Sequence, residues 1–226
     1  MPRKVSHDDP TRLYKSDLIE RLTRAHPYEP FFVFGPAIVA LMVYAFIAGS
    51  RPWYGLVGVF LAGTFFWTFC EYVLHRYLFH YEAKSEFGKK QMKLIHGIHH
   101  QFPNDTDRLV IPPAVGVLVA VAFFGVYTLL FGWWYGIALV SGWVGGYMLY
   151  DWTHYSTHHR KPRTRVGRAA RRRHLLHHYK YPDACYGVST GFWDWVFGTT
   201  EAKAQAAGKG HHKPEGVWEV IDNKVT

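Results

Sequence analysis

The feature that most constrains this chain is a set of four long apolar runs that carry almost no charge. Residues 31–49 and 53–74 are joined by a turn containing Pro52, and residues 111–131 and 133–150 are hinged at Gly132. Each run has about the twenty residues that a helix rising ~1.5 Å per residue needs to cross ~30 Å of hydrocarbon. Because both links are so short, the sequence predicts an all-α integral membrane protein with four transmembrane helices in two hairpins.

The basic residues indicate how such a protein would be oriented. Of the 26 Lys and Arg residues, six precede the first run, six lie between Arg76 and Arg108, thirteen follow Asp151, and only Arg51 falls in a turn. By the positive-inside rule, the N-terminus, the central loop and the C-terminal region are predicted to be cytosolic. The formal charge of +9 suits anionic lipid headgroups, and no aromatic-basic module typical of a nucleic-acid partner is present.

The two ends of the chain carry weaker signals. In the N-terminal segment, residues 1–30, apolar side chains recur at helical spacing opposite basic ones: Tyr14, Leu18, Ile19 and Leu22 against Lys15, Arg21 and Arg24. This pattern predicts a helix lying on the membrane surface, and an ordinary solvated helix packed on its own domain is the open alternative. Residues 31–199 are expected to form the membrane-embedded domain and residues 200–226 a tail, weakly ordered over 202–212, in which His211 and His212 have no assigned role.

Histidine is unusually abundant, and its distribution matters more than its count of 15. Eleven of the histidines fall in four clusters, at residues 75–80, 96–100, 154–159 and 174–178. Every cluster follows a predicted span or lies in a predicted cytosolic segment. The charge pattern and the histidine pattern therefore place the same segments on one side of the bilayer, as a helical cap.

The spacing within the clusters predicts metal ligation. Residues at i, i+3 and i+4 of a helix share a face, so His96, His99 and His100 are expected to converge on one point, and His174, His177 and His178 on another. His154 and His158 share a face, whereas His159 points roughly 140° away and is excluded. His75 and His80 are five apart, so either the backbone loosens there or His80 lies just past the helix end.

These clusters supply ten candidate ligands: His75, His80, His96, His99, His100, His154, His158, His174, His177 and His178. A structural zinc site needs four ligands, so ten indicate two metal ions with about five donors each and an open position for oxygen or substrate. A zinc or nickel transporter is the non-enzymatic alternative, but transporters place their ligands near the bilayer midplane, in broken helices.

The motifs as a whole resemble the fatty acid hydroxylase and sterol desaturase superfamily, and most of all its fatty acid 2-hydroxylase branch. The resemblance rests on Glu71 to His80, His96 to Pro113, Tyr150 to His159, His174 to Tyr179, Gly187 to Ser189 and Trp193 to Thr199. It implies a di-iron monooxygenase that uses O2 to hydroxylate a long acyl chain, free or in a sphingolipid, beside its carboxyl end. The family's metal ligands fall on the same ten histidines, and zinc in place of iron is expected in isolated protein.

The resemblance also bears on partners. Residues 1–30 leave no room for the cytochrome b5 domain of many eukaryotic members, so we expect a separate electron donor resembling cytochrome b5 or a ferredoxin. The substrate is expected to be a membrane lipid. A carotenoid or sterol oxygenase of the same superfamily, and a membrane protein that handles metal without catalysis, are the alternative functions.

Acidic and headgroup residues complete the predicted site. Glu71, Asp151, Asp183 and Asp194 are candidates to offset the metal charge and orient imidazoles, with helix capping an equal alternative for Asp151 and Asp194. The candidates to bind the lipid headgroup are Arg76, Arg108 and Tyr155. The run Arg171–Arg173 is interpreted as a lipid-phosphate or electron-donor contact, or simply as a cytosolic anchor.

Overall fold

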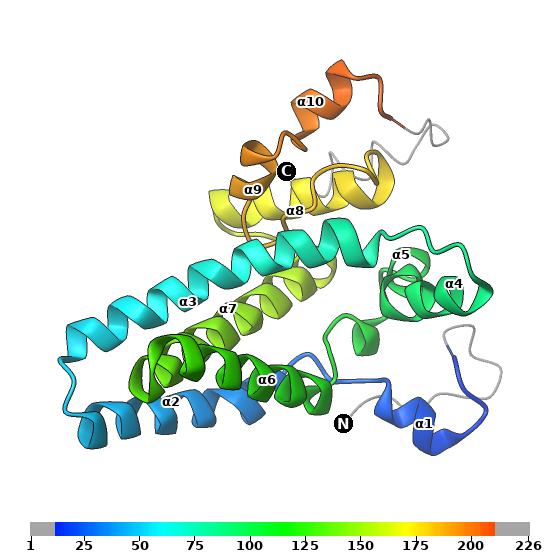
Figure 1. The fold of residues 1–226 in the computed structure, drawn as a ribbon. Helices are drawn as coiled ribbons and strands as arrows, with labels where there is room; N and C mark the ends of the chain where they lie inside the picture. The colour runs from blue at the N-terminus through cyan, green and yellow to red at the C-terminus, as the bar shows by residue number, and fades with distance from the viewer. Residues whose placement is uncertain (1–11, 211–226) are drawn as a thin grey trace. The chain divides into compact units, whose positions relative to one another are not determined.

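The structure, a computed structural model, describes residues 12–210, and every regular element in that range is helical. The order is α1 Asp17–Leu22, α2 Glu29–Gly49, α3 Trp53–Val73, the π-helix η1 Leu74–Phe79, α4 Glu86–Met92, the π-helix η2 Lys93–Gly97, α5 Ile98–Gln101, the 3-10 turn η3 Thr106–Arg108, α6 Pro113–Phe131, α7 Trp133–His159, α8 Arg165–Tyr179, α9 Phe192–Val196 and α10 Glu201–Ala206 (Figure 1).

The described residues form two compact units. We call residues 12–67 with 105–151 the apolar unit, and residues 68–104 with 152–210 the histidine unit. The long helices α3 and α7 contribute residues to both units.

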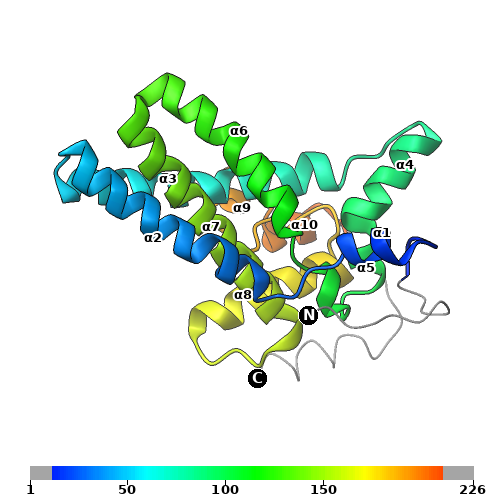
Figure 2. The same cartoon turned by 90° about the horizontal axis from the view of Figure 1, so that it is seen from below.

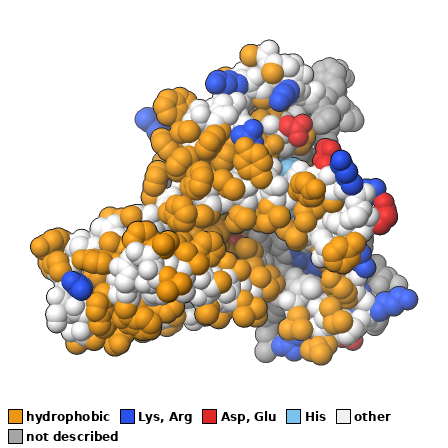
Figure 3. Space-filling view, in the orientation of Figure 1, with side chains coloured by type: hydrophobic (Ala, Val, Ile, Leu, Met, Phe, Trp, Pro, Cys, Tyr) orange, Lys and Arg blue, Asp and Glu red, His pale blue; other side chains and the backbone are white. Residues whose placement is uncertain are grey.

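Three helical segments are long and apolar enough to cross a membrane: Glu29–Gly49, Trp53–Phe79 and Thr106–Phe131. Their large side chains are turned outward in the apolar unit; Val39 is 62% exposed, Leu118 72% and Val121 64%. Hydrophobic atoms cover the visible face of these helices (Figure 3). Contiguous apolar surface on this scale is unfavourable in water and marks a surface that another apolar phase covers. The chain is a membrane protein.

The fourth predicted span, residues 133–150, is not among the helical segments that are apolar enough to cross a membrane. Residues 133–150 are helical, but they belong to the longer helix α7, which continues to His159. By length and composition, three of the described helices rather than four are apolar enough to span. α7 instead buries polar as well as apolar side chains, among them Ser141 and Trp143.

The helices of the apolar unit approach one another closely through glycine. A Cβ added at Gly142 of α7 would lie 1.9 Å from the carbonyl oxygen of Phe60 in α3, and one at Gly63 of α3 would lie 2.3 Å from that of Leu139. Gly132, with φ of 79°, makes the sharp turn between α6 and α7 that Figure 2 shows. A small core of Ala45, Leu56, Ile137 and Ala138 fills the contact between α2, α3 and α7.

The N-terminal segment differs from its prediction in one respect. The apolar residues of α1 are exposed as an interfacial helix requires, with Leu18 and Leu22 69% and 65% exposed. Arg24, however, is not on a solvated face: it is buried and pairs with Glu20 at 2.8 Å. Glu20 also binds Arg108, at 2.5 Å, so α1 is tied to η3 by a buried charge network. A sequence pattern that counts all arginines as polar surface misses such pairs.

The C-terminal stretch is more ordered than predicted where the structure describes it. Residues 201–206 form α10, whose Ala204 packs with Leu176, Tyr181 and Cys185. Thr200 caps the helix by accepting a hydrogen bond from Lys203 N. The expectation of weak order over 202–212 is therefore wrong for its first part, and His211 and His212 lie outside the described residues.

Candidate metal centre

The first two histidines stand on a loosened helix. α3 passes into the π-helix η1, which contains His75, and His80 is the residue that ends it. A wider π-turn changes the angle between residues, and π-segments are frequent at functional sites. The five-residue spacing thus has both explanations that the sequence offered, because the backbone loosens and His80 lies just past the helix end.

The second cluster does not converge on one point as predicted. His96 lies in the π-helix η2, and His99 and His100 lie in α5. His96 and His100 approach each other, with their Nε2 atoms 2.9 Å apart, whereas the Nε2 of His99 faces His154 and His178. The i and i+4 rings therefore share one site and the i+3 ring belongs to another.

The last two clusters show the same division. On α8, His174 and His178 approach each other at 3.0 Å, while His177 faces His80. Residue i+4 lies about 40° from i around a helix and residue i+3 about 60° on the other side, so a pair of adjacent sites separates them. His154 and His158 share a site, as predicted, and His159 stacks on Tyr155 outside both sites.

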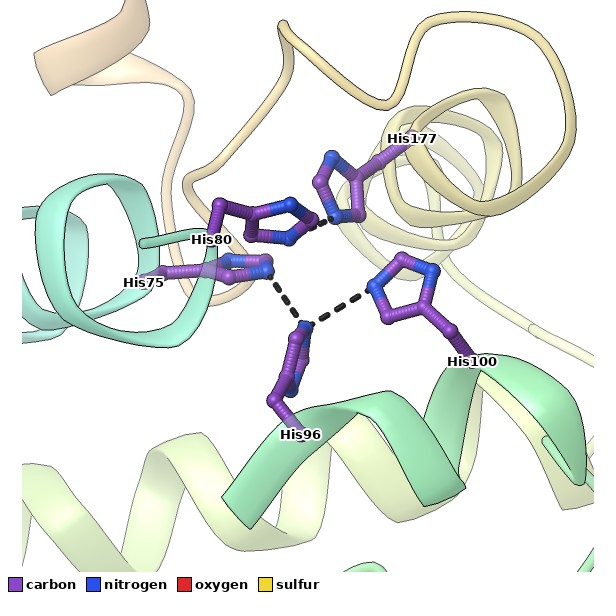
Figure 4. Close-up of side chains that lie close together, drawn as sticks. All are labelled: His75, His80, His96, His100 and His177. Carbon is purple, nitrogen blue, oxygen red and sulfur yellow. Dashed lines mark hydrogen bonds between the residues drawn. The ribbon is translucent and has the colours of Figure 1, made fainter. Parts of the chain in front are cut away.

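The ten rings form two groups of five, in each of which the donor nitrogens all lie within 4.8 Å of one another. Group A consists of His75, His80, His96, His100 and His177, and group B of His99, His154, His158, His174 and His178. Figure 4 shows the rings of group A pointing at a common centre from η1, the η2–α5 segment and α8. The two groups adjoin, because the ring of His100 in group A stacks on that of His178 in group B, with the ring centroids 4.2 Å apart. The sequence therefore identified all ten residues that the structure brings together.

The contacts inside each group fit a bound cation better than hydrogen bonding. A ring nitrogen carries either one hydrogen or one lone pair, so it makes one in-plane hydrogen bond. Yet Nε2 of His96 has two nitrogen neighbours, at 2.9 and 3.1 Å, and Nε2 of His99 has two at 2.9 Å. A central ion would satisfy all these lone pairs at once. Nitrogens about 2.1 Å from one ion lie at most about 4.2 Å apart, close to the observed spread.

Burial keeps these imidazoles in the form that binds metal. Desolvation, reinforced by neighbouring imidazoles, lowers the pKa of His96, His99, His174, His177 and His178 well below the ordinary value. Burial also lowers the pKa of His80, and it lowers that of His158 to about 3. Neutral imidazole is the ligand form, so each group could hold a metal ion without first losing protons.

Two of the four predicted acids act on the backbone around the site. Glu71 accepts hydrogen bonds from Val188 N and Ser189 N, at 2.6 and 2.8 Å. Asp194 accepts from Tyr186 N and Gly187 N, both at 2.9 Å. Within residues 12–210 neither carboxylate hydrogen-bonds an imidazole directly, and both hold the loop that contacts the rings. Asp194 is the third residue of α9 and does not cap it, so the capping alternative is wrong.

The other two acids differ. Asp151 lies inside α7, so it caps no helix, and among the described residues no imidazole hydrogen-bonds its carboxylate. Its burial raises its pKa well above the ordinary carboxyl value. Asp183 is exposed, and its charge opposes the lowering of the His80 pKa.

The three residues predicted to bind the lipid headgroup differ in whether a headgroup could reach them. Arg108 is buried against Glu20 and is not available to a lipid headgroup, which corrects that expectation. Arg76 donates to the Tyr72 hydroxyl at 2.8 Å and lies over the ring of Tyr186, beside group A. Tyr155 is half-buried and stacks on His159. Arg76 and Tyr155 stay predictions.

The arginines at 171–173 all have partners within the chain, and their interpretation as a lipid-phosphate or electron-donor contact, or as a cytosolic anchor, stays a prediction. Arg171 donates to the carbonyl of Arg160 and Arg172 pairs with Glu201. Arg173 donates to the carbonyls of Gly187 and Val188. The structural use of Arg173 was missed because sequence cannot show which backbone segment folds over α8.

The fold and the site together define a helical membrane protein with two adjoining histidine groups, each able to hold a metal ion. The model of the family described as fatty acid hydroxylase matches residues 60–199, a range that contains all ten histidines. The chain belongs to the fatty acid hydroxylase family, and it is a lipid hydroxylase.

Comparison with individual relatives supports this family assignment. The chain is 36% identical over 189 residues to a dihydroceramide fatty acyl 2-hydroxylase of Arabidopsis thaliana, covering 83% of this chain and 79% of the relative. It is 33% identical over 210 residues to the fatty acid 2-hydroxylase of Mus musculus, covering 84% and 56%. The solved structure of full-length scs7p, of which only the hydroxylase domain is visible, superposes with a TM-score of 0.78 at 33% identity, covering 84% and 72%.

Proposed function

We propose that this chain is a non-haem di-iron monooxygenase that hydroxylates a long acyl chain at C2, in a fatty acid or a sphingolipid-type lipid. The observation that carries the proposal is the convergence of ten imidazoles, seven of them buried and three partly buried, in two adjoining groups of five, inside a fatty acid hydroxylase family match. The position of attack is taken from the printed activities of the relatives, which are 2-hydroxylases.

The donor set supports a redox metal. Imidazole ligands suit iron, copper and zinc rather than magnesium or calcium, and cleaving an unactivated C–H bond requires a metal that changes oxidation state. Bound iron would supply the activation of O2. The residues of the chain do the rest: His75 and His177 present Nε2 inward because their Nδ1 atoms donate to backbone carbonyls, and burial excludes water from the rings.

The membrane arrangement is part of the proposal. Residues 31–49, 53–74, 111–131 and 133–150 cross the bilayer as two hairpins, and both termini and the histidines lie in the cytosol. The charge distribution supports this topology, since only Arg51 falls in a turn between paired spans. The substrate is a membrane lipid, and electrons arrive from a separate donor.

Expression in a host that lacks hydroxylated lipids tests the proposal, with mass spectrometry of the lipid extract as the readout. We expect acyl chains that gain one oxygen at C2, and we expect His177→Ala to abolish the product. Unchanged acyl lipids together with oxygenated carotenoids or sterols would assign the chain to the alternative oxygenase. Purified protein that binds metal but consumes no O2 with lipid and reductant would make it a metal-handling protein.

A further inference from the structure

The two histidine groups differ in what lies behind their rings. In group A, a loop of residues 184–189 passes behind two ligands. His75 Nδ1 donates to the carbonyl of Tyr186 at 2.5 Å, and His177 Nδ1 donates to the carbonyl of Ala184 at 2.8 Å. Both rings are thereby fixed in one tautomer and one orientation, with Nε2 directed at the centre of the group.

The 184–189 loop is itself held by buried charged side chains. Asp194 and Glu71 together accept hydrogen bonds from four successive backbone N–H groups, at residues 186–189. Arg173 donates to the carbonyls of residues 187 and 188, at 2.5 and 2.9 Å. The fit is close, since a Cβ added at Gly187 would lie 2.0 Å from the carbonyl oxygen of Thr190. A loop with its polar groups bound in this way resists displacement.

Group B lacks an equivalent support at two of its rings. The Nδ1 atoms of His99 and His174 are buried, and neither has a hydrogen-bond partner among residues 12–210. Its ligands stand on the α-helices α5, α7 and α8, and within the described part of the chain these helices position the His99 and His174 rings without a hydrogen bond at Nδ1.

We propose that the 184–189 loop makes group A the slowly exchanging metal site, while group B releases its metal first, and that Asp194, Glu71 and Arg173 are positioning residues acting through the loop. The inference rests on the proposed dimetal function. Hydrogen bonds to the outer nitrogen of a ligating histidine fix its tautomer and raise its basicity. Losing such partners typically costs about 10–100-fold in metal affinity.

Zinc release from the full-length protein in detergent tests this directly. The protein is loaded with two zinc ions per chain, an excess of a colour-forming chelator is added, and release is followed in time. We expect two phases of equal amplitude. His174→Ala should remove the fast phase and His177→Ala the slow one, which assigns each phase to its group.

The loop is then tested with Asp194→Asn and Glu71→Gln, which nearly preserve volume. Each should speed the slow phase roughly 10–100-fold and leave the fast phase unchanged. Glu201→Gln, which removes an acid paired with exposed Arg172, is the matched control and should change neither phase. A general loss of structure would instead speed both phases.

The failures are distinguishable. Protein that binds no zinc at either group would overturn the proposed dimetal centre as well as this inference. Two zinc ions released in a single phase, a fast phase assigned to group A, or loop variants that speed both phases alike would overturn only the unequal sites.

Discussion

The apolar unit and the histidine unit differ in which side chains they expose and which they bury. In the apolar unit many large hydrophobic side chains are exposed, such as Leu129 at 87%. In the histidine unit the most buried residues include titratable groups, with His174 and His177 fully buried and Asp194 1% exposed. Exposed apolar surface and buried polar groups are the two informative departures from ordinary packing. The first unit therefore suits a lipid solvent, and the second is built around two groups of imidazoles that could each hold a metal ion.

The largest expected effect follows from removing a metal ligand. His174→Ala should abolish lipid hydroxylation, by at least about 100-fold, and leave one metal ion per chain, because losing a ligand costs more than losing a group behind it. Product formation and elemental analysis measure the two effects. His159 belongs to a histidine cluster but lies outside both groups, so His159→Ala should keep two ions per chain. A loss of one ion in this variant would show that the ligands have been assigned to the groups incorrectly.

A pH series on metal-free protein probes the burial of the rings. Five imidazoles have pKa values held well below 6.5, so below that pH the unfolded chain binds more protons than the folded one. The free energy of unfolding should be flat above pH 6.5 and fall by a few kcal/mol between pH 6.5 and 5.5, at about 1.4 kcal/mol per proton per pH unit. Unfolding in detergent measures it. Stability that rises on acidification would contradict burial of neutral rings.

A charge placed on the outward face tests the lipid solvent of the apolar unit. Val121→Arg, near the middle of α6, should disfavour membrane insertion by about 2.5–3.5 kcal/mol. Val166→Arg is the matched control, because Val166 is 77% exposed but lies on α8 in the histidine unit. Insertion assays compare the two variants. Equal effects on insertion would contradict the claim that the apolar unit faces lipid and the histidine unit does not.

The smallest effect is expected at the glycine contacts of the apolar unit. Gly142→Ala places a methyl group against the Phe60 carbonyl and should destabilise the protein by roughly 1–3 kcal/mol. Gly125→Ala, with nothing within 4 Å of its added Cβ, should leave the melting temperature in detergent unchanged or slightly higher. A tolerated Gly142→Ala would show that α3 and α7 are not packed this closely.

Much of this molecule could be predicted because its signals are local. Apolar length marked the long helices to within two residues at most ends, and the i, i+4 rule paired His96 with His100 and His174 with His178. The division of each triplet was not predictable, because which neighbour His99 or His177 faces depends on helices far away in the sequence.

The 184–189 loop escaped prediction for the same reason. Gly187 and Asp194 stood out as motif residues, but their pairing, and the role of Arg173 behind them, arise only when the loop folds over α8. Likewise, Arg108 looks like a solvated cation until Glu20, 88 residues away in the sequence, is placed beside it. Pairs formed across long stretches of chain leave no periodic trace.

The central claim is that ten imidazoles hold two metal ions in two groups. Elemental analysis of the full-length protein, purified anaerobically, measures this most directly. The account predicts two ions per chain in the wild-type protein and one in either His177→Ala or His174→Ala. A correctly folded wild-type protein with no bound metal, or with one ion that both substitutions remove, would contradict it.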